Sequence, residues 1–181
     1  MADFRRESGP DELLIQYSYL FYEDLKDYPL LDLACGDGHN GIFLASKGFS
    51  VVLADRSEEA LSQAKLNAQE AGVTVQFRQV DLEQEVVNPL EGLFFSAVLV
   101  FRYLHRPLIP FIKKSLKQGG ILMYETFTTE QVLFGKPKNP DHLLKAGELR
   151  SWFHDWEVIY TFEGTIGVPP KAIARLVCRK A

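Results

Sequence analysis

Residues 30–55 carry the pattern that most limits how this chain can fold. Two short apolar runs, at 30–34 and 49–54, have the continuous hydrophobicity of strands that are buried on both faces. Between them lies a turn that contains Gly36, followed by a segment at 38–47 with the apolar spacing of a helix. A strand, a glycine turn, a helix and a second strand together form the unit from which parallel sheets are built.

The same alternation of apolar runs and helical segments continues along the rest of the chain. Further helices are expected at 11–27, 57–71, 107–117 and 146–153, and further strands at 73–80, 94–101, 121–126, 156–162 and 172–178. Glycines and prolines between the last two strands indicate a hairpin. The sequence therefore predicts an α/β fold: a Rossmann-like, doubly wound, mostly parallel seven-stranded sheet with an antiparallel C-terminal hairpin.

A chain of 181 residues suits one domain, so we expect residues 1–181 to form a single unit. Residues 1–28 would add a helical cover at the amino end. Residues 127–145 read as a long loop, and loops of this length inside domains are usually functional or disordered. Two interpretations stay open for 127–145: a lid over a substrate pocket, or a mobile surface loop with ordinary lysines.

Charge and cysteine content exclude several classes of protein. The net charge of -4 argues against nucleic-acid partners, which usually require a clustered basic face. Cys35 and Cys178 are too few and too distant for a disulfide framework, and we expect both to be reduced thiols. The amino end has no apolar signal core, and no apolar run approaches the roughly 20 residues of a membrane span. We therefore expect a cytoplasmic protein without a membrane partner.

The glycine turn itself admits two kinds of ligand. Gly36, Gly38 and Gly41 spell G-x-G-x-x-G, the dinucleotide fingerprint, which alone is a weak signal. Asp32 lies inside the preceding apolar strand, where a carboxylate needs a partner, and the ammonium of S-adenosylmethionine could provide one. The same charge, with Asp37 beside it, would repel a pyrophosphate. These acids favour S-adenosylmethionine over a dinucleotide.

Two more acids end the next strands. Asp55 could accept both ribose hydroxyls of a bound nucleoside, and Asp81 could accept from the adenine amino group. A dinucleotide site would also place an acid in the position of Asp55, so Asp55 does not distinguish between the two ligands. Acids after strands also often cap the next helix, and this alternative stays open for Asp55, which has Ser57 nearby, and for Asp81.

The segment 33–40, Leu-Ala-Cys-Gly-Asp-Gly-His-Asn, resembles the first motif of the class I S-adenosylmethionine-dependent methyltransferases. Together with 43–49 and 147–157 it is similar to their tellurite-resistance (TehB-like) branch. Ala34 stands where many members of the family have glycine, and Ser96 replaces an acid that often opens the fourth strand.

What this resemblance implies is a set of cofactor contacts and a small-molecule methyl acceptor. The implied contacts are Asp32, Ala34, Cys35, Gly36, Asp37, Gly38, Asp55, Arg56, Asp81, Leu82 and Phe101. Methyl transfer to a soft thiolate or chalcogen anion needs only positioning, whereas an oxygen acceptor needs a base.

Candidates for that chemistry follow the strand at 94–101. His105 could act as a base, Tyr103 could cover the sulfonium, and Arg102 or Arg106 could hold an anionic acceptor. His105 could equally be a residue at the start of a helix that contacts backbone. For both arginines, a solvated or carboxylate-paired role is an alternative.

Glu125, at the end of the strand 121–126, could orient the acceptor. No histidine and cysteine cluster has the spacing of a zinc site, so no metal is expected. The sequence thus predicts a methyltransferase that acts on a small molecule. Two alternatives stay open: an NAD-type dinucleotide-dependent oxidoreductase, and a cofactor-binding protein without transfer activity.

Overall fold

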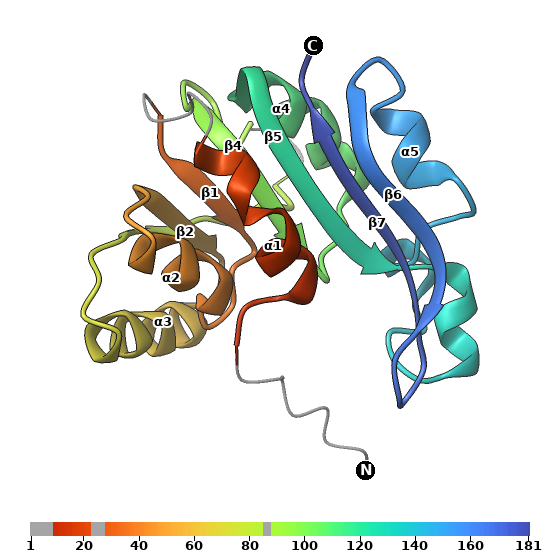
Figure 1. The fold of residues 1–181 in the computed structure, drawn as a ribbon. Coiled ribbons are helices and arrows are strands. Elements are labelled where there is room, and N and C mark those ends of the chain that lie inside the picture. The colour runs from red at the N-terminus through yellow and green to blue at the C-terminus, as the bar shows by residue number, and fades with distance from the viewer. Residues whose placement is uncertain (1–8, 23–27, 85–87) are drawn as a thin grey trace.

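The computed structural model describes residues 9–22, 28–84 and 88–181, and its centre is one seven-stranded sheet in the order β3-β2-β1-β4-β5-β7-β6 (Figure 1). The strands are β1 Leu30–Leu33, β2 Val51–Asp55, β3 Gln76–Gln79, β4 Phe95–Phe101, β5 Leu116–Phe127, β6 Glu157–Ile166 and β7 Lys171–Arg179. Neighbours from β3 to β5 pair in parallel, and β7 pairs antiparallel with both β5 and β6. The predicted Rossmann-like sheet and its closing hairpin are confirmed.

Helices cover both faces of the sheet (Figure 1). The side chains of α1 Glu12–Tyr17, α2 His39–Ser46 and α3 Glu58–Glu70 pack into one core cluster, and those of α4 Ile109–Ser115 and α5 Glu148–Trp152 pack into another. β4 separates the two clusters: Leu99 faces the first and Val100 the second, and both are fully buried. The continuous apolar run at 94–101 is therefore the sequence of a strand with core on both sides.

Helix starts follow the expected capping chemistry at two positions. Asp11 caps α1 by accepting a hydrogen bond from the Leu13 N–H at 3.0 Å. Ser57 caps α3, where its hydroxyl accepts from the Ala60 N–H at 3.1 Å. Each cap satisfies one of the amide groups that a helix leaves unpaired in its first turn.

The first helix is shorter than the expected 11–27. α1 ends at Tyr17 and continues as a 3-10 helix over Ser18–Tyr22, while 23–27 lies outside the described residues. The run Tyr-Ser-Tyr-Leu-Phe-Tyr is poor in strong helix formers. Ser18 also donates its hydroxyl to the Ile15 carbonyl at 3.2 Å, a local bond that competes with regular helix.

Other boundaries differ by a few residues. β5 begins at Leu116, because Gly119 and Gly120 lie within the strand and do not end the preceding helix there. A 3-10 turn, Arg106–Leu108, precedes α4. No helix among the described residues has both the length and the apolar character to cross a membrane.

Segment 127–145 is ordered structure at the carboxyl end of β5, and not the plain loop that its glycine and prolines suggested. It contains 3-10 turns at Thr129–Leu133 and Pro140–His142, and Thr128 and Leu144 form a bridge across its base. The side chain of Gln131 is buried and accepts a hydrogen bond from the Ala172 N–H of β7 at 2.8 Å. The base of the segment is therefore tied to the sheet.

Candidate functional site

The turn after β1 requires left-handed backbone at three positions. Ala34, Gly36 and Gly38 have φ angles of 56°, 58° and 80°. Glycine adopts this region freely, whereas a residue with a Cβ pays roughly 1–2 kcal/mol there. Ala34 therefore accepts a strained conformation, which accounts for the glycine that the resemblance expects at this position.

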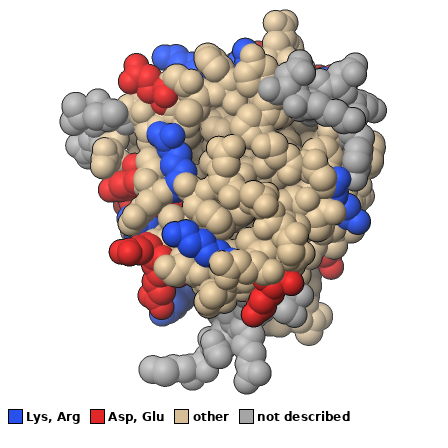
Figure 2. Space-filling model, turned by 90° about the vertical axis from the view of Figure 1, so that its left-hand side faces the viewer, with Lys and Arg blue, Asp and Glu red and all other residues tan. Residues whose placement is uncertain are grey.

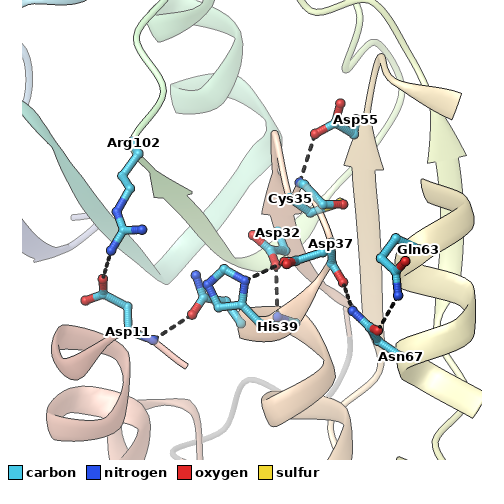
Figure 3. A network of polar contacts seen from close by, with 12 residues as sticks. Asp11, Asp32, Cys35, Asp37, His39, Asp55, Gln63, Asn67 and Arg102 are labelled. Carbon is cyan, nitrogen blue, oxygen red and sulfur yellow. Dashed lines mark hydrogen bonds and ion pairs between the residues drawn. The ribbon is translucent and has the colours of Figure 1, made fainter. Parts of the chain in front are cut away.

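Asp55, at the end of β2, holds this turn in place. Its carboxylate accepts from the Gly36 N–H at 2.9 Å (Figure 3), and also from the Ser57 N–H at 2.9 Å. The side chain is half-buried at the rim where the parallel strands end. Ser57, and not Asp55, caps α3; Asp55 fixes the glycine turn, which the sequence did not reveal.

Asp32 lies beneath the first turn of α2, not at the open rim. It is 2 % exposed, and its carboxylate accepts from the Gly41 N–H at 2.9 Å (Figure 3). Burial raises the pKa of Asp32 to about 7; the Gly41 hydrogen bond lowers it, and the charges of Asp37 and Asp55 raise it. The partner that a buried acid requires is in this case a backbone amide.

That pKa has a consequence for stability. Between about pH 4 and pH 7 the folded protein binds more protons at Asp32 than the unfolded chain does, so the free energy of unfolding is expected to fall as pH rises across this window. Urea unfolding from pH 4.5 to 7.5 measures the slope. Asp32→Asn keeps an oxygen for Gly41 but cannot ionise, and its slope should be shallower. Equal slopes in the two proteins would contradict the assignment.

Asp37 and His39 form a pair at the start of α2. The Asp37 carboxylate lies 2.7 Å from the His39 Nδ1, and both side chains are about one quarter exposed. The Asp37 carbonyl also accepts from the Asn67 amide of α3 at 2.9 Å (Figure 3). The turn is therefore held from β2, α2 and α3 together.

The amino-terminal segment joins the same rim, which sequence reasoning missed. The Asp11 N–H donates to the buried Asn40 side chain of α2 at 2.8 Å, and the Asp11 carboxylate lies 3.8 Å from Arg102 (Figure 3). An acid directly before a helical run was the available signal, since Asp is a preferred N-cap. Arg102 therefore pairs with a carboxylate, which is one of the alternatives that the sequence left open for it.

Glu125 is buried and paired with a residue that the sequence did not single out. Its carboxylate lies 2.6 Å from the Arg175 Nε of β7, and only 5 % of Glu125 is exposed. Burial raises the pKa of Glu125, with Asp11 adding to the rise and Arg175 opposing it. An arginine in the middle of an otherwise apolar strand was the overlooked sign of an ion pair.

Arg106 has a structural role. Its Nε and Nη2 atoms contact the Glu148 carboxylate at 2.7 and 2.9 Å, and its guanidinium also donates to the carbonyls of Asp141 and Leu143. This bidentate pair connects the start of α4, segment 127–145 and α5. The carboxylate-paired alternative is therefore the one that the structure supports.

His105 and Tyr103 differ in their surroundings. His105 is half-buried, and its ring caps no helix and makes no hydrogen bond to the described part of the chain. The ring of Tyr103 packs against the core cluster that contains Leu82, and its hydroxyl lies near Glu83, Arg56 and Asp81. Arg56 follows β2, and Asp81 and Glu83 follow β3, so Tyr103 lies beside the residues that follow these two strands.

The remaining cofactor candidates lie along the same rim. Asp81 is exposed and accepts from the Glu83 N–H at 3.0 Å, while Arg56 contacts Glu83 at 3.4 Å. Leu82 and Cys35 are buried, Phe101 is half-buried, and burial raises the pKa of the Cys35 thiol. Ser96, in contrast, lies at the opposite end of the sheet, where its hydroxyl donates to the Tyr28 carbonyl. No cluster of metal-ligating side chains occurs within 9–22, 28–84 and 88–181.

Comparisons with known proteins agree with this arrangement. A family model described as a methyltransferase domain matches residues 24–162. The probable S-adenosyl-L-methionine-dependent methyltransferase TehB of Haemophilus influenzae is 25 % identical over 135 residues, which are 72 % of this chain and 46 % of TehB. The crystal structure of TehB superposes with a TM-score of 0.72 at 17 % identity, covering 84 % of this chain and 57 % of that one.

Other relatives carry different names. The ubiquinone biosynthesis O-methyltransferase of Actinobacillus pleuropneumoniae is 28 % identical over 68 % of this chain and 62 % of its own length. The tRNA 5-carboxymethoxyuridine methyltransferase of Escherichia coli is 22 % identical over 72 % and 60 %. The chain spans about half the length of the curated relatives it matches. Since the family match covers most of its residues, the chain belongs to the class I S-adenosylmethionine-dependent methyltransferases, in their TehB-like branch.

Proposed function

We propose that this protein transfers a methyl group from S-adenosylmethionine to a small-molecule acceptor. The observation that carries the proposal is the turn after β1, which Asp55 locks and beneath which Asp32 is buried. β1 lies between β2 and β4, so the connections diverge at its carboxyl end. Such a switch point leaves a crevice in which open α/β sheets bind their ligands.

The acidic side chains around this crevice fit S-adenosylmethionine better than they fit a dinucleotide. The cofactor carries an ammonium and a sulfonium, and the acids Asp32, Asp37 and Asp55 surround the turn. A dinucleotide would bring a pyrophosphate to the start of α2, beside Asp37. Because like charges repel in a partly buried site, this argues against the oxidoreductase alternative.

We assign cofactor contacts to the rim residues that the sequence singled out. Gly36 and Gly38 give the turn its left-handed backbone, and Asp55 has lone pairs left for ribose hydroxyls after it accepts its two amides. Asp81 is exposed and suits the adenine amino group. The other assigned contacts are Ala34, Cys35, Asp37, Arg56, Leu82 and Phe101, whereas Asp32, buried beneath α2, supports the turn from below.

When bound, the cofactor supplies an electrophilic methyl group, and the residues of this chain position the acceptor. Arg102 and Glu125 are held in ion pairs, so we assign them to orientation and not to proton transfer. An oxygen acceptor must also lose a proton, and His105 is the base we propose for it. A thiolate or a chalcogen anion is already deprotonated and needs no base. Methyl transfer to such an acceptor therefore does not require His105.

A small and anionic acceptor suits the charges at this rim. Arg102 pairs with Asp11 at 3.8 Å, a contact longer than a hydrogen bond, so its guanidinium keeps N–H groups that can donate to an anion. The tRNA-modifying relative raises the alternative of a nucleic-acid acceptor. Against it stand the net charge of -4 and the face in Figure 2, where the described basic and acidic residues are interspersed.

We further propose that the tip of segment 127–145 acts as a lid. Its base is anchored, whereas Leu133, Phe134 and the lysines at 136 and 138 are exposed. Hydrogen exchange should show added protection in 132–140 when S-adenosylhomocysteine and an acceptor are both bound. The base of the segment, near Gln131 and Leu144, serves as an internal control that stays protected throughout. Unchanged exchange in the tip would exclude a lid.

Calorimetry and transfer assays test the main proposal. We expect S-adenosylmethionine to bind and NAD(H) not to bind, and the opposite result would overturn the methyltransferase assignment. Transfer of a labelled methyl group is then screened over thiol, chalcogen, oxygen and nitrogen acceptors, with unmodified tRNA as a separate arm. Binding without any labelled product would favour a cofactor-binding protein that transfers nothing.

A further inference from the structure

A small cavity of about 130 Å³ lies between segment 127–145 and β6. It is lined by Thr128, Thr129, Glu130, Ala146, Glu163 and Gly164. Figure 1 shows the segment beside the β6–β7 hairpin, at the edge of the sheet opposite to β3. The strands that border the cavity, β5 and β6, are two and four strands away from β1, which is roughly 10 and 19 Å at the usual spacing. The cavity is therefore a site separate from the crevice at the glycine turn.

The side chains of Thr128 and Glu163 stand on the same face of the sheet. Thr126 of β5 and Glu163 of β6 are both paired with Ala174 of β7. Paired residues of neighbouring strands share a face, and so do residues two apart in one strand. Thr128 continues the ladder of β5, because its N–H donates to the Ala172 carbonyl at 3.0 Å. Since Thr128 and Glu163 also line the cavity, their side chains project into it together.

The hydroxyl of Thr128 has no hydrogen-bond partner among residues 9–22, 28–84 and 88–181. Thr128 is only 4 % exposed, so bulk water does not solvate it as it solvates a surface hydroxyl. A hydroxyl carries one donor and two acceptor positions, and buried polar groups in native proteins are nearly always paired. The partner of this hydroxyl must therefore come from the cavity that it faces.

Two carboxylates make the cavity negative. Both carboxylate oxygens of Glu163 accept from the Gly147 N–H, at 3.0 and 3.3 Å, which holds this side chain beside the start of α5. The carboxylate of Glu130 makes no hydrogen bond or ion pair with the described part of the chain. Among the described residues that line the cavity, none carries a positive charge. The charges therefore favour a cation as the occupant.

We propose that this cavity binds the primary ammonium group of a small organic cation. An ammonium has three N–H donors and no acceptor, and the Thr128 hydroxyl with the carboxylates of Glu130 and Glu163 provides three acceptors. A calcium ion, which usually takes about six to eight oxygen ligands, fits less well. No group of three metal-ligating side chains occurs in the described ranges, and the volume leaves room for a short alkyl chain.

Such a ligand would join segment 127–145 to β6. It would contact Thr128 and Glu130 at the base of the segment and Glu163 on the strand, so binding would add a second attachment beside the bond from Ala172 to Gln131. This inference goes beyond the proposed function and does not depend on it, because the two ligands occupy separate sites.

Titration of the ¹⁵N-labelled protein with n-propylammonium chloride tests the site. The amide signals of Gly147, which bonds to Glu163, and of Gly164 should shift and reach saturation. The Gly36 amide, which bonds to Asp55 in the other crevice, should not shift. Tetramethylammonium has the same charge but no N–H donor and should not saturate these signals. Unsaturated shifts with n-propylammonium, equal binding of both cations, or binding of calcium chloride in their place would each overturn the proposal.

Variants of the lining residues test the contacts. Glu163→Gln and Glu130→Gln should each raise the dissociation constant of n-propylammonium about 10-fold, because a charge-assisted hydrogen bond becomes a neutral one. Thr128→Val should raise it about 5-fold without lowering the melting temperature, because the hydroxyl has no protein partner to lose. Glu70→Gln removes the same charge from the exposed end of α3 and should bind like the wild type.

Affinities in the cavity variants equal to that of Glu70→Gln would refute the proposal. Glu130 is exposed and makes no bond that the fold needs, so its variant gives this answer even if Thr128→Val does not fold.

Discussion

Asp55→Ala is expected to weaken the binding of S-adenosylhomocysteine by about 1–3 kcal/mol, or roughly 5- to 150-fold in the dissociation constant. The variant loses the acceptor that we assign to the ribose hydroxyls. It also releases the Gly36 and Ser57 amides, so the turn that lies against the ligand is no longer held. Calorimetric titration of the purified variant measures the change.

A charge-matched control accompanies this variant. Glu59→Ala removes one negative charge from the exposed first turn of α3, close in sequence to Asp55 but without a bond to the turn. Its affinity should equal that of the wild type. If Asp55→Ala binds as tightly as Glu59→Ala does, the ribose does not lie at Asp55.

Gly41→Ala is expected to lower the free energy of unfolding by about 2 kcal/mol. A Cβ on Gly41 would lie 2.2 Å from the Leu53 Cδ2, 3.0 Å from the Val51 Cγ1 and 3.1 Å from the Asp32 carboxylate. Overpacking of this kind costs about 1–3 kcal/mol or more, and the better helix propensity of alanine returns up to about 1 kcal/mol. Thermal melting should shift down by about 4–8 °C for a chain of this size.

Ser46→Ala is the control for this substitution. Ser46 lies in the last turn of the same helix, is exposed and bonds only to the local Phe43 carbonyl. Such a surface change usually stays within about 0.5 kcal/mol. A Gly41→Ala protein as stable as Ser46→Ala would mean that α2 lies farther from β1 and β2 than described.

The fold could be predicted because its signals are local and redundant. Each inner strand, such as 94–101, is almost entirely apolar because both of its faces are covered, and a run of this kind between helical segments is typical of a buried strand. The predicted helix 11–27 was too long because apolar spacing shows neither the weak helix propensity of residues 17–22 nor the bond from the Ser18 hydroxyl to the Ile15 carbonyl. The 3-10 turns of segment 127–145 were not predicted because its order comes from contacts with β7 and with Arg106 in the turn before α4.

The candidate site could be predicted only in part, because many of its bonds join distant residues. The positions of the acids that follow the strands could be predicted, because the strand ends are visible in the sequence pattern. Their protein partners were not found: Arg175 lies 50 residues from Glu125, and Gly36 lies 19 residues from Asp55. Tertiary packing decides which group bonds to a buried acid. The pattern of a single sequence does not show that choice.

The anchoring of segment 127–145 at its base suggests a use in protein engineering. The Thr128–Leu144 bridge and the bond between Gln131 and Ala172 close the base, and only Gln131 also bonds into the tip, at Gly135 and Lys136. Residues 132–140 therefore form an exchangeable cassette, whose length and composition can be varied in a library without altering the sheet or the glycine turn. Selection from such a library would change which molecules reach the rim while the cofactor half of the protein stays constant.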